Sequence, residues 1–218
     1  MTTMTKNNYD PTGEDMDDLL RRLSLPIRNH SRRVAIVSSV IAEHTRKFRG
    51  FRNVHVGLHL PVVAYLGGMF HDIGKLILPS FGVDDSEYHR HPLAGVELLE
   101  CQKENLFDNP EQLLHVSDMV HYHHERADGN GFPDGLRAKD IPLTSSICVV
   151  ADWLDHFLAI DMSYSRGEID IQQAIDERVG SQFCEIAAES AKRAWPYIEK
   201  QYIKWNSSAV KPDTASSH

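Results

Sequence analysis

The sequence predicts an all-α fold, arranged as a single-domain helical bundle of about seven to eight helices. In most segments, apolar residues recur three and four positions apart, which places them on one face of an α-helix. Strand-like segments are almost lacking. No internal repeat or linker divides the chain, so we expect one domain over residues 14–205. The polar segments 1–13 and 206–218 are expected to be disordered.

The longest amphipathic pattern covers residues 27–48, with Pro26 suited to its first turn and Gly50 to its end. The further segments expected to be helical are LPVVAYLGGMFHDIGK, HPLAGVELLECQKENL, PEQLLHVSDMVHYHHE, PLTSSICVVADWLDHFLAI, IDIQQAIDERV and QFCEIAAESAKRAWPYIEKQY. We expect Gly74 to stop the first of these, and Pro196 to kink or end the last. In PLTSSICVVADWLDHFLAI, β-branched residues would suit a buried strand, but the length favours a buried helix.

The composition is that of an ordinary globular protein, with 41% hydrophobic and 25% charged residues. The net charge of −8 argues against a binder of nucleic-acid polymers, which needs a basic surface. It permits a small anionic ligand, because bound divalent cations supply positive charge locally. No apolar run is long enough for a membrane span, and the first residues lack the apolar core of a signal peptide. With three widely spaced cysteines and no CxxC, a cytoplasmic protein is expected.

Histidine is unusually frequent, with 13 in the chain. A histidine alone on an apolar helical face, such as His44, is more often a hydrogen-bonded core residue than a metal ligand. Other histidines without a supporting motif are expected to lie on the surface, namely His55, His59, His89, His115, His121, His156 and His218. Among them, His89 and His121 lie close enough to the histidine clusters that their role stays open.

A second group of side chains predicts a metal centre. Its members are His30, His71, Asp72, His91, His123, His124 and Asp152. Asp152 lies in the apolar segment ICVVADWLD, where a charge is costly unless it is paired or bound to metal. Imidazole and carboxylate ligands without thiolate suit Fe, Mn, Ni or Zn. Seven ligands are too many for one ion and suit two cations that share a carboxylate, about 3.5–4 Å apart.

The chain carries, in this order, the motifs NHSRRVA, HDIGK, HPLAG, HHERADGNGFPDGL and VVADWLD. They resemble the HD-GYP subfamily of HD-domain metal-dependent phosphohydrolases over residues 27–182. HDxGK alone is moderately specific, whereas its combination with HHExxDGxGxPxGL is a strong signal. The resemblance implies a helical bundle of the HD-domain type. It also implies a binuclear phosphodiesterase of bacterial signalling that hydrolyses the 3′–5′ bond of cyclic di-GMP.

The same resemblance assigns roles to individual residues. It implies one metal held by His30, His71, Asp72 and Asp152. It implies a second held by Asp72, His91, His123 and His124, so that Asp72 bridges the two. Asp72 and Lys75 are the expected catalytic residues, with Lys75 reaching the phosphate. A hydroxide between two divalent cations, iron first and otherwise manganese or nickel, is expected to attack phosphorus.

The loop HHERADGNGFPDGL is expected to wrap the mouth of the site. Gly129 and Gly135 permit backbone shapes closed to other residues, as does Gly131, and Pro133 fixes a turn. The resemblance implies that Gly131, Phe132 and Pro133 shape the pocket and meet GGDEF-domain partner proteins. GFP stands where GYP is usual, so Phe132 keeps the packing of a tyrosine and loses its hydroxyl.

Two other departures from the family pattern affect the expectations. Pro26 stands where some members have a glutamate that supports a third metal, so we expect two metals. The segment IDMSYSRG stands where the family has an RPYR-like phosphate contact. Tyr164 and Arg166 are its candidate substrate-binding residues beside Lys75, although Asp161 lies near the expected arginine.

Two alternatives to an active cyclic di-GMP phosphodiesterase stay open. One is a catalytically weak signalling module that binds metal, nucleotide or a GGDEF-type partner, which the changes at Phe132 and Asp161 favour. The other is an HD hydrolase for another phosphate ester, such as a nucleotide. The glycine-rich DGNGFPDGL argues against this third reading, because generic HD nucleotidases lack it.

Overall fold

The computed structural model describes residues 16–45, 59–78, 85–107, 109–160 and 169–209. Within these residues the chain forms helices and no strand beyond two isolated β-bridges, which confirms the all-α prediction. The helices of six or more residues are α1 (Met16–Arg21), α2 (Leu25–Thr45), α3 (Leu60–Phe70), α5 (His91–Cys101), α7 (Pro110–Tyr122), α8 (Leu143–Ile160), α10 (Ile171–Asp176) and α11 (Glu185–Ala209). Shorter turns are η1 (Ile73–Ile77), α4 (Asp85–Tyr88) and α6 (Lys103–Leu106).

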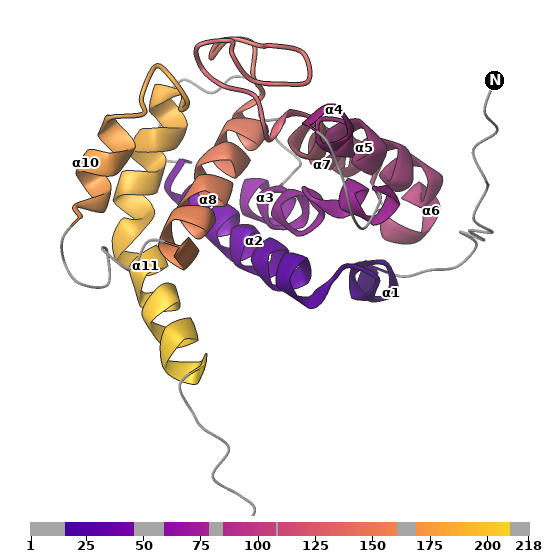
Figure 1. Ribbon diagram of the computed structural model, residues 1–218, viewed down its shortest axis with the longest axis horizontal. Helices are drawn as coiled ribbons and strands as arrows, with labels where there is room; N and C mark the ends of the chain where they lie inside the picture. The colour runs from indigo at the N-terminus through magenta and orange to yellow at the C-terminus, as the bar shows by residue number, and fades with distance from the viewer. Residues whose placement is uncertain (1–15, 46–58, 79–84, 108, 161–168, 210–218) are drawn as a thin grey trace, which may run out of the picture.

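Helices α2, α3 and α8 form the middle of the bundle (Figure 1), with α10 and α11 on one side and α5, α6 and α7 on the other. α2 packs against α3, α8 and α11, and α7 packs against α3, α5 and α8. α5 also packs against η1. These contacts bring the end of α3, the start of α5 and the end of α7 into one region.

The buried face of α2 follows the predicted spacing. Val34 and Ile41 are fully buried in the core, and His30 lies on the same face and is also buried. Pro26 is the second residue of the helix, where its missing N–H is not needed. The predicted end at Gly50 lies outside the described residues.

The HDIGK segment follows α3 in a turn and the 3-10 helix η1. α3 already ends at Phe70, before Gly74, and Gly74 lies inside η1. A side chain at Gly74 would overlap the carbonyl oxygen of His91. This glycine therefore allows α5 to approach η1 closely, and that approach brings His91 to the end of α3.

The segment that suited either a strand or a helix forms helix α8. Ile147, Val150 and Leu154, spaced at three and four, are fully buried. Length therefore predicted this element better than β-branched content did. Neither α8 nor any other described helix is long and apolar enough to cross a membrane.

The sequence allowed the last helix to end at Pro196. It does not end there, because α11 continues to Ala209. Proline lacks the N–H that would bond to the carbonyl of Lys192, four residues earlier. The side-chain amide of Gln172 in α10 donates to this carbonyl instead, at 3.2 Å. A tertiary contact thus satisfies the group that the proline leaves unpaired, and α11 extends into the segment predicted as a tail.

Candidate metal centre

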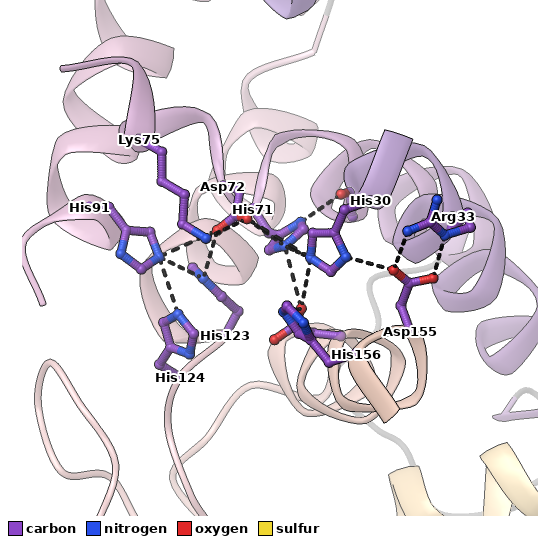
Figure 2. Close-up of polar contacts among 12 residues, drawn as sticks. His30, Arg33, His71, Asp72, Lys75, His91, His123, His124, Asp155 and His156 are labelled. Carbon is purple, nitrogen blue, oxygen red and sulfur yellow. Dashed lines mark hydrogen bonds and ion pairs between the residues drawn. The ribbon is translucent and has the colours of Figure 1, made fainter. Parts of the chain in front are cut away.

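The seven predicted ligands converge at one place from five helices (Figure 2), which are α2, α3, α5, α7 and α8. His30 lies in α2, His71 and Asp72 follow α3, His91 begins α5, His123 and His124 follow α7, and Asp152 lies in α8. Five of them are buried, and His124 and Asp152 are partly buried. The side chains predicted as metal ligands therefore lie close together in the folded chain.

The first cluster is built around His30. Its Nε2 lies 3.0 Å from Asp152 Oδ1 and 3.2 Å from His71 Nε2. His71 Nε2 in turn lies 3.5 Å from Asp72 Oδ2. Asp152 Oδ1 is buried and forms no hydrogen bond of acceptable geometry. A buried carboxylate oxygen that lacks a hydrogen bond is costly, and a cation between these atoms would remove that cost.

The second cluster contains three imidazoles. His91 Nε2 lies 3.1 Å from His123 Nε2 and 3.2 Å from His124 Nε2. All three rings contact one another, with centroids 4.1–5.1 Å apart. Three ring nitrogens that point at one another form a site for a cation.

Asp72 lies between the two clusters. Its Oδ2 faces His71, whereas its Oδ1 lies 3.5 Å from His91 Nε2 and 3.9 Å from His123 Nε2. Lys75 Nζ donates to Oδ2 at 2.7 Å. Burial raises the pKa of Asp72, but its partners, with the Lys75 ammonium group hydrogen-bonded to it, outweigh burial and hold that pKa well below its usual value. Asp72 is therefore ionised, with one oxygen directed at each cluster.

The backbone determines which ring nitrogen faces the centre. Three imidazoles place Nδ1 at 2.7–2.8 Å from a backbone carbonyl three residues earlier: His71 at Gly68, His91 at Tyr88 and His123 at Val120. A carbonyl only accepts, so Nδ1 carries the hydrogen and Nε2 presents a lone pair. The neutral Nε2 atoms of His91 and His123, 3.1 Å apart, then repel each other, whereas a shared cation would be attracted to both.

Burial keeps four of these imidazoles neutral. It lowers the pKa of His71 and of His123, and it lowers the pKa of His91 to about 4 and that of His124 to about 3. Neutral imidazole is the form that binds a metal ion. These four rings are therefore in their ligand state at neutral pH.

Asp155 contacts His30 through Nδ1, the ring nitrogen that does not face the first cluster. Its Oδ2 accepts from His30 Nδ1 at 2.7 Å, and its two oxygens accept from Arg33 Nε and Nη2 at 2.7 and 2.9 Å. Tyr202 of α11 donates its hydroxyl to the same carboxylate. Burial lowers the pKa of His30, but Asp152 and Asp155 outweigh it and raise the pKa to about 9. Asp155 thus orients His30 with Nε2 directed at the centre.

The glycine-rich loop after α7 is held by Glu125. The Glu125 carboxylate is buried and accepts three backbone N–H groups, from Asp134, Gly135 and Leu136, at 2.7–3.0 Å. Gly129 and Gly135 have positive φ angles of 80° and 67°, as the sequence predicted. The loop is therefore a closed structure tied to the residue next to His124.

Phe132 forms one wall of the second cluster. Its ring stacks on His124, with centroids 4.5 Å apart, and lies 4.1 Å from the ring of His89. Gly131 allows this approach, since a side chain there would overlap the backbone at His124. The phenylalanine in place of tyrosine thus packs directly on a predicted ligand, and Pro133 beside it is exposed.

His156 is exposed, as the sequence analysis expected, but that analysis gave it no role. In the structure its Nε2 lies 3.4 Å from Asp152 Oδ1. Its ring lies 4.5 Å from that of His30. The i,i+4 spacing from Asp152 was a visible signal, because such residues share a helix face. The roles of Asp155 and Arg33 follow from similar spacings, whereas nothing local points to Tyr202.

The other predicted residues have plain outcomes. His44 Nδ1 donates to the Val40 carbonyl oxygen within α2 at 2.9 Å, as expected for a structural histidine. His121 Nε2 lies 3.7 Å from Asp134 Oδ2 in the loop. The candidate substrate-binding residues Tyr164 and Arg166 lie outside the described residues, as do Asp161, His55 and His218.

The donor set fits divalent transition metals. It combines five buried or partly buried imidazoles with two carboxylates and no thiolate, which suits Fe, Mn, Ni or Zn. The unbonded Asp152 Oδ1 and the opposed Nε2 lone pairs are the features that a cation would satisfy. The chain therefore contains a His/Asp cluster suited to metal binding.

Parts of the chain are similar in sequence to known proteins. The chain is 33% identical over 114 residues to a cyclic di-GMP phosphodiesterase of Pseudomonas aeruginosa, which covers 48% of the chain and 25% of the relative. It is 31% identical over 94 residues to 3′3′-cGAMP-specific phosphodiesterase 2 of Vibrio cholerae, covering 39% of the chain and 17% of the relative. Over 183 residues it is 27% identical to a cyclic di-GMP phosphodiesterase of Thermotoga maritima, covering 80% of the chain and 43% of the relative.

The matched regions span less than half the length of each of these three relatives. Their similarity agrees with the resemblance to the HD-GYP subfamily. The HD domain model matches residues 63–179, more than half of the chain, and these include the adjacent His71 and Asp72. The chain belongs to the HD domain family.

Proposed function

We propose that this chain is a metal-dependent phosphodiesterase that hydrolyses the 3′–5′ phosphodiester of a cyclic dinucleotide, with cyclic di-GMP as first candidate. One observation carries the proposal. Asp72 directs one carboxylate oxygen at each of two ligand clusters, which is the arrangement that a two-cation hydrolase needs. Two of the reported relatives bear the name cyclic di-GMP phosphodiesterase, and a third acts on 3′3′-cGAMP.

The centre would hold two divalent cations, iron first and otherwise manganese or nickel. His30, His71, Asp72 and Asp152 would hold one, and Asp72, His91, His123 and His124 the other. When bound, the cations supply a hydroxide nucleophile near neutral pH and offset the negative charge of the phosphate. The imidazole ligands at both positions favour transition metals over Mg²⁺ or Ca²⁺.

Lys75 would bind the non-bridging phosphate oxygens. Burial lowers its pKa, but Asp72 outweighs burial and raises it, so Lys75 carries a positive charge. Lys75 Nζ also lies 5.4 Å from the centroid of the Tyr88 ring. The ammonium group is thus held beside Asp72, where negative charge would develop during phosphodiester cleavage.

The loop would define the substrate-binding side. Phe132 shields His124 from solvent, and a planar base could pack against the neighbouring His89 and Tyr88 rings, which lie 6.2 Å apart. Tyr164 and Arg166 stay predicted contacts of the substrate. A GGDEF-domain partner also stays a prediction, and Pro133 with its exposed neighbour Asp134 is the part of the loop open to it.

The experiment is turnover of cyclic di-GMP by the metal-loaded protein. We expect the wild type to release the linear dinucleotide or GMP, detected by chromatography. Asp72→Ala should lower kcat by at least about 10³-fold, because both cations depend on this carboxylate. Asp140→Ala, which changes an exposed aspartate outside the centre, should leave turnover unchanged.

A parallel assay with 3′3′-cGAMP identifies the preferred dinucleotide. Absence of turnover of either substrate with Fe, Mn or Ni would contradict the proposal. If the same protein still bound a dinucleotide, the catalytically weak signalling module would be the better account.

A further inference from the structure

The solvent side of the first cluster contains a histidine that the family pattern does not assign. His156 lies one helical turn after Asp152 on α8, and its side chain is 56% exposed. His30, Asp152 and His156 each place one possible ligand atom within 4.8 Å of the other two. Figure 2 shows His156 beside His30, with the two ring centroids 4.5 Å apart.

An ordinary surface pair does not explain this arrangement. Exposed i,i+4 ion pairs contribute little, and they join atoms that solvent could otherwise satisfy. Here the acceptor is Asp152 Oδ1, a buried atom without a hydrogen bond. Three imidazole nitrogens surround it, at 3.0 Å for His30, 3.4 Å for His156 and 3.7 Å for His71. Such a set is typical of donors arranged around a cation.

His156 does not create a separate third site. His30 Nδ1 is occupied by Asp155, so only its Nε2 is free to bind a cation. One imidazole nitrogen has one lone pair and binds one ion. The His30–Asp152–His156 group therefore shares its ion with the first cluster.

We propose that His156 is a fifth protein ligand of the first cation, on its solvent-exposed side. This inference rests on the proposed metal centre. With His30, His71, Asp72 and Asp152, it would give the first ion five protein ligands. The second ion would have four protein ligands and a more open coordination shell. The two sites are thus unequal, and the first should hold its ion more tightly.

The test compares Co²⁺-loaded wild type, His156→Ala and the control His121→Ala. His121 also faces an aspartate at 3.7 Å, but that pair joins the end of α7 to the loop and includes no residue of the first cluster. In His156→Ala, the dissociation constant of one ion should rise at least about tenfold, which is the lower range for loss of an outer-shell partner. The other ion should keep its affinity in a competition with a chelator.

The visible absorption of Co²⁺ gives a second readout. His156→Ala should change the spectrum of one ion, and added imidazole should restore it by filling the vacant position. Wild type and His121→Ala should show neither response. Since His156 is half exposed, thermal melting of the metal-free variant should match that of the wild type.

The outcomes separate this inference from the proposed function. If His156→Ala keeps the wild-type affinity and spectrum while the wild type binds two ions and hydrolyses the dinucleotide, only the role of His156 is wrong. If the wild type binds no Co²⁺, both the metal centre and the inference are wrong.

Discussion

At the scale of single residues, the geometry of the centre depends on the hydrogen-bond partner of each imidazole Nδ1 atom. Backbone carbonyls orient His71, His91 and His123, and these carbonyls cannot be removed by substitution. His30 differs, because a side chain orients it. Asp155 receives hydrogen bonds from His30, Arg33 and Tyr202, which belong to two helices far apart in the sequence. The orientation of His30 is therefore the part of the first cluster that mutation can test.

Asp155→Asn should weaken the first metal site without unfolding the protein. Asparagine keeps the shape and one acceptor oxygen, but it removes the charge that supports His30 as a ligand. We expect about a 10–100-fold loss of affinity for one of two cations, measured by chelator competition. Tyr202→Phe removes a single hydrogen bond, so it should cost about 1 kcal/mol of unfolding free energy and change metal affinity little. Equal metal affinity of Asp155→Asn and wild type would argue against this role.

The sequence indicated the clustered histidines and aspartates, but not the residues that orient them. Each ligand lies in a motif or interrupts an apolar stripe, as Asp152 does, so its chemistry is visible locally. His156 and Asp155 share a helix face with Asp152, and the spacing alone could have indicated them. Tyr202 lies 47 residues after Asp155, and its contact arises only when α11 packs near α8.

At the scale of elements, the loop after α7 shows how a glycine-rich segment becomes ordered. The Glu125 carboxylate accepts hydrogen bonds from three consecutive backbone N–H groups, which in a β-sheet would be satisfied by a neighbouring strand. The motif places this glutamate next to the histidines, but the sequence did not predict which groups its side chain would contact. Since Glu125 directly follows His124, the same turn positions a ligand and closes the loop.

Glu125→Gln tests this anchor. The amide offers one acceptor oxygen and one donor group, so at least one buried backbone N–H loses its partner. The expected cost is about 1–3 kcal/mol of unfolding free energy, with faster hydrogen exchange at the amides of Asp134, Gly135 and Leu136. Glu97→Gln, at an exposed position on α5, serves as the control and should change neither quantity. Unchanged exchange in the loop of Glu125→Gln would contradict the anchor.

Two helix boundaries differ from those that proline and glycine predict from the local sequence. Proline predicts a helix end, but α11 continues because Gln172 satisfies the carbonyl of Lys192. Glycine predicts a helix stop, but Gly74 lies beyond the end of α3 and serves the close approach of His91. In both cases a contact between distant segments decides the outcome, and a sequence read alone does not contain it.

At the scale of the whole molecule, the bundle is a frame that brings five helices to one centre. The all-α class was predictable, because apolar spacing along each segment is a local property. The family resemblance led us to expect that these side chains would lie together. The packing of α2, α3, α5, α7 and α8 brings them close to one another. A cation at such a junction would link helices far apart in the chain and so favour the folded state.

The most direct test of the two-cluster centre is the number of transition-metal ions bound per chain, measured by elemental analysis after metal loading and dialysis. We expect about two ions in the wild type, about one each in His30→Ala and His124→Ala, and none in Asp72→Ala. This pattern would show two sites that share one carboxylate. A wild type without bound metal, or an Asp72→Ala variant that keeps the wild-type content, would contradict the account.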